Sequence, residues 1–151
     1  MLRIAIVSLL LIPCVATEAA AAAPFKPGGS YSGTTDQGKK VTAKVSADGA
    51  KLKRFKIAWS ADCGSKTLRD STVFEDFDLP AGGTLDIRGP YEDDAFGLTG
   101  SHNVVLQGSF RHAGGKYTVS GTFKDVIAVG SPASTEHYRC KTGKVHWSAK
   151  A

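Results

Sequence analysis

The sequence is poor in the residues and spacings that mark catalytic and metal sites. It has three cysteines in 151 residues, and none of them forms the Cys-x-x-Cys pair that is typical of zinc and redox sites. It also lacks a His-Glu-x-x-His metal motif and a Gly-x-Ser-x-Gly nucleophile turn. We therefore predict no catalytic residues, no metal ligands and no cofactor.

Long apolar runs are absent beyond the N-terminus. Residues 4–16 form an apolar stretch behind a basic start, and the alanine-rich residues 19–23 follow it. This order is typical of a secretory signal peptide, and the stretch is shorter than the about 20 residues that cross a bilayer. We predict a secreted or periplasmic protein with no transmembrane anchor in its mature form: a signal peptide at residues 1–22, a linker at residues 23–29 and one domain at residues 30–151.

Two cysteines lie outside the predicted signal peptide. An even pair in an exported protein predicts a disulfide, here between Cys63 and Cys140. The alternative is a metal site that combines both cysteines with His137 and His146. Cys14 lies within the signal peptide, and Pro13 before it departs from the small residue that a lipid-attachment signal carries, so we expect no lipid anchor.

The remaining chain has no helical period, and apolar residues alternate with polar ones between glycine-rich turns. The clearest hairpin spans residues 104–123, with its turn at residues 112–115, so that Phe110 faces Tyr117 and Gly108 faces Val119. A second hairpin is expected around Thr142-Gly143, with Cys140 opposite Val145. About eight or nine such strands predict an all-β fold, an antiparallel two-layer β-sandwich or a flattened barrel.

Other segments predict finer features of this fold. Trp59 and Trp147 fall on inward faces and should lie in the core, whereas the four histidines fall in turns and on outward positions. Leu52 is out of phase with its strand, which predicts a bulge near Lys53-Arg54. Residues 64–72 and 89–101 show no period and are expected to be loops. In residues 73–79, Val73, Phe77 and Leu79 should face inward.

Positive charge is concentrated between Lys39 and Lys56, where seven cations stand against one acid. Outward positions on two adjacent strands gather such cations into a patch, which predicts docking to an anionic cell-envelope or extracellular polymer. The alternative is a solvated face whose lysines discourage edge-to-edge pairing. Export and the absence of a recognised motif argue against nucleic acid. The predicted binding residues in this segment are Lys40, Lys44, Lys53, Arg54 and Lys56.

Acidic residues dominate the next part of the chain, from Asp70 to Asp94. The loop expected at residues 89–101 contains Tyr91 and Phe96, aromatic side chains that we expect to contact a ligand. Calcium bound by residues 92–94 is an alternative use of this loop, although the spacing matches no known calcium loop. A secreted hydrolase or a protein inhibitor is the alternative function, with its site in the same loop.

Several segments together suggest a family resemblance. They are Tyr31–Gly38, Val45–Gly49, Trp59–Cys63, Val119–Phe123 and Cys140–Trp147. The chain resembles small secreted bacterial β-sandwich domains of unknown function that carry a late Cys-x-Thr-Gly-x-x-x-Trp signature. The resemblance covers most of the chain after the signal peptide and implies an exported β-domain, without catalytic residues to transfer. Our hypothesis is therefore an exported, non-catalytic binding module.

Overall fold

A computed structural model describes residues 22–95, 98–130 and 137–151. These residues contain strands and no helix, as the alternation predicts. Phe25, in the segment predicted to be a linker, is buried and packs edge-on against Phe110. The strands are β1 (Ser30–Thr35), β2 (Lys40–Val45), β3 (Lys51–Asp62), β4 (Thr67–Asp78), β5 (Thr84–Ala95), β6 (Leu98–Ala113), β7 (Lys116–Gly130), β8 (His137–Lys141) and β9 (Val145–Lys150).

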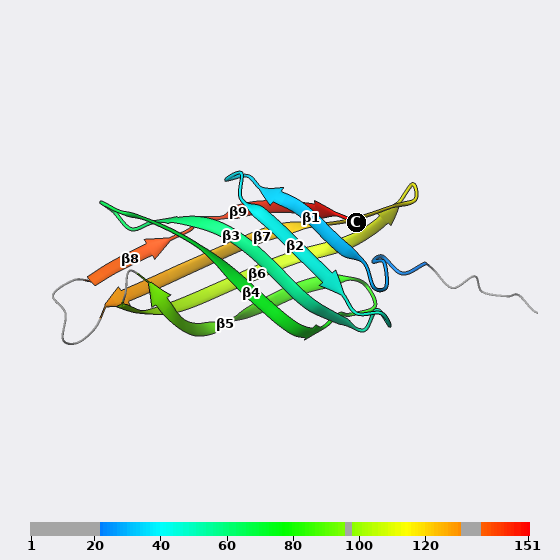
Figure 1. Ribbon diagram of the computed structural model, residues 1–151, viewed down its shortest axis with the longest axis horizontal. Helices are drawn as coiled ribbons and strands as arrows, with labels where there is room; N and C mark the ends of the chain where they lie inside the picture. The colour runs from blue at the N-terminus through cyan, green and yellow to red at the C-terminus, as the bar shows by residue number, and fades with distance from the viewer. Residues whose placement is uncertain (1–21, 96–97, 131–136) are drawn as a thin grey trace, which may run out of the picture.

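All these strands belong to one antiparallel sheet (Figure 1). Its main order is β4-β3-β2-β1-β9-β7-β6-β5, and β8 pairs with both β3 and β7. The ring β3-β2-β1-β9-β7-β8 closes a six-stranded barrel, to which β4, β5 and β6 are added. The all-β prediction is confirmed, and of the two architectures expected, the structure has the barrel.

The predicted disulfide is confirmed and closes this barrel. Cys63 follows β3 and Cys140 lies in β8, and their Cα atoms are 4.1 Å apart. The bond stands where the two strands share a single residue pair, Asp62 with Lys141. Because the cysteines are bonded to each other, the alternative metal site built on them is wrong.

The core is formed by inward residues of the ring together with those of β4, β5 and β6. Trp59 and Trp147 are buried there, as predicted, and Trp147 packs against Phe55 with ring centroids 4.9 Å apart. The bulge predicted near Lys53-Arg54 is confirmed, because Lys44 pairs with Arg54 but Val45 pairs with Leu52. The extra residue returns Leu52 to the inner face, where it is fully buried.

The register predicted for the β6–β7 hairpin is wrong by two residues. Phe110 pairs with Val119, and Gly108 faces Gly121. The turn is the two-residue Gly114-Gly115, with φ of 56° and 73°, rather than a four-residue turn. Gly108 leaves room for the indole of Trp147, since a Cβ on Gly108 would lie 2.7 Å from Trp147 Cζ2, and Gly121 allows the close approach of the β6 backbone.

The predicted C-terminal hairpin is also wrong, because β8 and β9 do not pair with each other. Both lie along the same edge of β7, Cys140 opposite Ile127 and Val145 opposite Phe123. Thr142 lies between β8 and β9 and keeps the chain bonded to β7 there. Its Oγ1 accepts a hydrogen bond from the Asp125 N–H (2.9 Å), and its own N–H donates to the Asp125 carbonyl (3.1 Å). Thr142-Gly143, which resembles a hairpin turn in the sequence, is therefore a short interruption between two strands that follow one another along the same edge of β7.

Both predicted loops contain strands instead. β4 begins at Thr67 and pairs with β3 along its length, and residues 89–101 belong largely to the β5–β6 hairpin. The inward face predicted for β4 is wrong as well: Thr72 and Phe74 are buried, whereas Val73 and Phe77 are exposed. Only Leu79 is buried as expected. The alternation of β4 is difficult to recognise in the sequence because one of its inward residues, Thr72, is polar.

Candidate functional site

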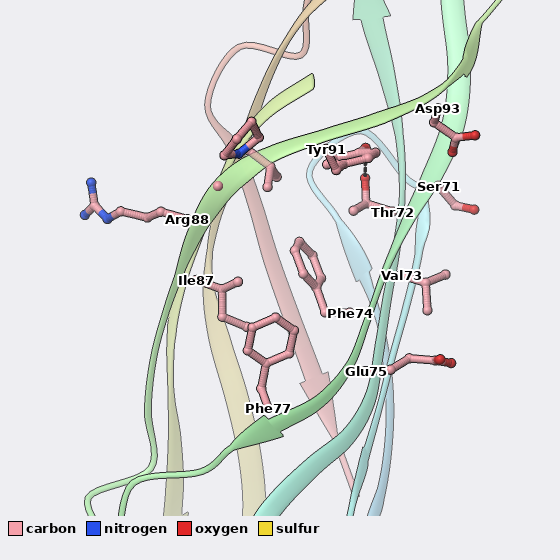
Figure 2. A pocket seen from close by; sticks show the side chains of 13 residues that line it. Ser71, Thr72, Val73, Phe74, Glu75, Phe77, Ile87, Arg88, Tyr91 and Asp93 are labelled. Carbon is pink, nitrogen blue, oxygen red and sulfur yellow. Dashed lines mark hydrogen bonds between the residues drawn. The ribbon is translucent and has the colours of Figure 1, made fainter. Parts of the chain in front are cut away.

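A groove separates β4 and β5, the two strands at the ends of the main sheet order. Each pairs on one side only, β4 with β3 and β5 with β6. The groove between them has a volume of about 420 Å³, within the range of about 300–1,000 Å³ that is usual for small-molecule sites. Near-continuous runs of both strands line it, together with Val104 of β6 (Figure 2): residues 71–75 and 77 of β4, and residues 87–91 and 93 of β5.

One end of the groove is apolar. Phe74, Phe77 and Ile87 lie together there (Figure 2), with the rings of Phe74 and Phe77 6.0 Å apart. Within the described residues, the exposed large hydrophobic side chains are Val73 (40%) and Phe77 (36%), and both line this groove. Exposed apolar side chains that line one concavity are a mark of a binding site.

The other end of the groove is polar and leads into the core. The hydroxyls of Thr72 and Tyr91 lie 3.1 Å apart (Figure 2). Trp59 Nε1 donates to Thr72 Oγ1 (2.9 Å), and the Tyr91 hydroxyl donates to Asp125 Oδ2 (3.3 Å). The same carboxylate oxygen lies 2.7 Å from His102 Nδ1. A chain of hydrogen bonds thus runs from the groove to a buried carboxylate.

Asp125 and His102 form a buried pair behind Tyr91. Their side chains are 0% and 2% exposed, and the imidazole stacks on the Tyr91 ring at 4.2 Å. His102 Nε2 and Asp125 Oδ1 have no hydrogen-bond partner in the described structure. The outward placement predicted for His102 is therefore wrong. His102 lies an even number of residues from the inward-facing Val104 and Leu106 of β6, and Asp125 lies an even number from Phe123 and Ile127 of β7. Side chains at such spacings point to the same face of a strand, so the sequence contained a signal that both residues face inward.

Burial makes the Tyr91 hydroxyl an unusually weak acid. Removal from water raises the pKa of its hydroxyl far above its ordinary value of about 10, and the nearby Asp125 carboxylate raises it further. The folded protein therefore keeps this proton at a pH where the unfolded chain has lost it. The resulting contribution to stability is complete below about pH 10 and falls as the pH rises toward the folded-state pKa.

This linkage predicts the alkaline behaviour of a Tyr91→Phe variant. Its free energy of unfolding should be lower than that of the wild type at pH 8, because the hydrogen bonds to Thr72 and Asp125 are lost. Above pH 10 it should fall less steeply with pH than that of the wild type. Urea unfolding at pH 8, 10 and 11 measures both quantities. If the free energy of unfolding falls equally steeply with pH above pH 10 in both proteins, the raised pKa of Tyr91 is contradicted.

The basic residues predicted to bind a polymer fall into two groups in the structure: some are paired with acceptors among the described residues, and others are not. Lys53 forms an ion pair with Asp76, and Arg54 Nε lies 3.8 Å from Glu75 Oε1, because the acidic part of β4 runs beside β3. Lys44 Nζ donates to the Gly28 carbonyl (2.8 Å) and to Ser30 Oγ (3.2 Å). The basic and acidic segments therefore do not form two separate patches.

Lys40 and Lys56 belong to a smaller group that we name the cation cluster, which consists of Lys39, Lys40, Lys56 and Arg69. These side chains surround a shallow hollow on the outer face of β2, β3 and β4. Within the described ranges, none of the four forms an ion pair. The one acid that lines the hollow is Asp70, whose Oδ1 accepts the Ser71 N–H (2.7 Å). This cluster keeps a net positive charge.

Of the two aromatic residues expected to contact a ligand, Tyr91 lines the groove, and Phe96 lies outside the described residues. Residues 92–94 lie within β5 rather than in a loop. In the part of the chain that is described, no three His, Cys, Asp or Glu side chains gather as metal ligands do. The same part contains no helix that is long and apolar enough to span a membrane.

Comparison with known proteins adds no relative to this picture. No protein-family model matches the chain, and searches of curated proteins and of solved structures give no match either. The resemblance to small secreted β-sandwich domains therefore stays a prediction. The groove and the cation cluster are the features of the described residues that bear on function.

Proposed function

We propose that this protein is an exported, non-catalytic binding module that holds an apolar ligand in the groove between β4 and β5. The observation that carries the proposal is that Val73 and Phe77, the exposed large hydrophobic side chains of the described residues, both line this one concavity, with Phe77 pointing into it and Val73 at its outer rim (Figure 2). Covering such side chains with a ligand contributes about 25 cal/mol per Å² of apolar surface removed from water. The disulfide and the predicted signal peptide support export.

The lining of the groove favours binding over hydrolysis. Ser71 lines it, but no histidine does among the described lining residues, so this serine has no adjacent base of the kind that activates a nucleophile. His102 and Asp125 are adjacent to each other, but the ring of Tyr91 stacks on the imidazole and neither residue lines the groove. This pair is therefore not placed to act as a base on a ligand in the groove. A ligand in the groove meets hydroxyl groups and apolar side chains, and the charged residues Glu75, Arg88 and Asp93 also line it.

Binding of a neutral apolar dye tests the proposal. N-phenyl-1-naphthylamine should bind the wild type saturably at one site, with increased emission. A Val73→Ser/Phe77→Ser variant should bind at least about tenfold more weakly, since a tenfold change needs only about 1.4 kcal/mol of lost apolar contact. Both side chains are exposed, so the variant should keep its fold.

The matched control is Val126→Ser. This half-buried valine lies on β7, outside the groove lining. It should leave the dye affinity unchanged, and thermal unfolding should show that all three proteins are folded. Undiminished binding by the Val73→Ser/Phe77→Ser variant, or no binding by the wild type, rules out the groove as the site.

The cation cluster carries a second candidate function, docking to an anionic cell-envelope or extracellular polymer. The supporting observation is that Lys40 and Lys56 stand with Lys39 and Arg69 around one hollow without an ion pair among the described residues. Lys53 and Arg54 contribute less to this function than expected, because the carboxylates of β4 neutralise them. Docking of this kind should weaken steeply with added salt.

A further inference from the structure

The groove and the cation cluster are parts of one continuous surface along β4. Ser71 lines both the groove and the hollow of the cluster. Two residues further on, Val73 in the wall of the groove pairs directly with Lys56 of β3. Opposite residues in an antiparallel pair have Cβ atoms about 4.5–5.5 Å apart. Lys56 therefore lies next to the β4 wall of the groove, on the outer face of the sheet that it shares with Val73.

Polarity rises in one direction along this surface. The apolar end holds Phe74, Phe77 and Ile87, and the hydroxyls of Thr72 and Tyr91 mark the opposite end (Figure 2). Beyond that end, toward the start of β4, stands Arg69 of the cation cluster. An elongated ligand laid along β4 thus passes from an apolar environment to a polar one and then to a cationic one.

The charges near the polar end are positive in sum. The cation cluster supplies four cations, against the carboxylates of Asp70 in the hollow and Asp93 on the opposite wall of the groove. Glu75, further along the groove, lies 3.8 Å from Arg54 and is compensated by it. An anionic group therefore gains more from this end of the surface than a neutral group does.

We propose that the ligand is a single-chain amphiphile with an anionic head, whose apolar chain lies in the groove and whose head contacts Lys56 and Arg69. This inference rests on the proposed function and names its ligand class. We commit to a free monomeric amphiphile rather than a bilayer surface. The reason is that the apolar contacts lie within a groove of about 420 Å³, and the described residues expose no large apolar side chains beyond Val73 and Phe77.

Titration calorimetry with two matched probes, dodecanoate and dodecanol, tests the inference at pH 8 and below the aggregation concentration of either probe. They share one chain and differ in head charge. The wild type should bind dodecanoate at least about tenfold more tightly than dodecanol in low salt, and 0.5 M salt should reduce this preference. Lys56→Gln/Arg69→Gln should abolish the preference and leave dodecanol affinity unchanged. The control Lys116→Gln/Lys124→Gln, on exposed positions of β7, should preserve it.

The possible failures are distinguishable. Equal affinity for both probes, or a preference that survives Lys56→Gln/Arg69→Gln, overturns the anionic head while the groove stands. Failure of both probes to bind overturns the proposed function as well. Tighter binding to poly-glutamate than to dodecanoate assigns the cation cluster to a polymer. Sedimentation with phosphatidylglycerol vesicles without dodecanoate binding assigns it to a bilayer, and either result contradicts the inference.

Discussion

Replacing His102 with alanine is expected to lower the free energy of unfolding by about 3–5 kcal/mol. The Asp125 side chain is 0% exposed, and His102 Nδ1 is 2.7 Å from its Oδ2. Without the imidazole, the carboxylate keeps only the longer bond from the Tyr91 hydroxyl, at 3.3 Å. A buried charge that loses its partner costs far more than the pair itself contributes.

Urea unfolding near neutral pH measures this effect. His146→Ala, at an exposed position of β9, is the control and should change the free energy of unfolding by no more than about 0.5 kcal/mol. The double variant His102→Ala/Asp125→Ala should lose less than the sum of the two single variants, because it leaves no unpaired carboxylate. A loss below about 1 kcal/mol for His102→Ala contradicts the structural role of the pair.

Removing the disulfide with Cys63→Ala/Cys140→Ala is expected to cost about 4 kcal/mol in the chain-entropy model. The bond joins residues 77 positions apart, so it restricts a large part of the unfolded chain. It also reinforces the junction of β3 and β8, which share one residue pair. Loss of the bond should therefore weaken the closure of the barrel as well as global stability.

Two measurements separate these effects. Denaturant unfolding gives the global loss, and hydrogen exchange should show faster opening of β8 than of β2, whose pairing with β1 and β3 does not depend on the bond. Unchanged stability, or equal acceleration in β2 and β8, contradicts the assignment of the disulfide as the closing link of the barrel.

Local chemistry in the sequence accounts for much of the fold. Alternation predicts the strands, the phase of Leu52 predicts the bulge, and the even cysteine pair predicts the disulfide. Turn length does not follow from composition, since His112-Ala113-Gly114-Gly115 is compatible with a four-residue or a two-residue turn. The positive φ of both glycines selects the shorter turn and shifts the register by two residues.

The site is harder to predict because it depends on contacts between distant strands. The groove exists because β4 and β5, adjacent in the chain, lie at opposite ends of the sheet order and meet only when the sheet closes (Figure 1). Thr72, His102 and Asp125 are polar residues at inward positions: their polarity suggests outward placement, although each has the parity of buried apolar neighbours on its strand. Among the described residues, Tyr91 is the one predicted binding residue that lines the groove.

Methyl NMR during a dodecanoate titration is the sharpest test of the groove as the binding site, because it locates the ligand as well as detecting it. The groove predicts the largest shift changes at the methyl groups of Val73, Ile87 and Val104, all of which line it. The methyl groups of Val41 and Val45, buried on β2 within the barrel, should not shift. Saturable binding with shifts confined to residues outside the groove rules out the groove as the ligand site.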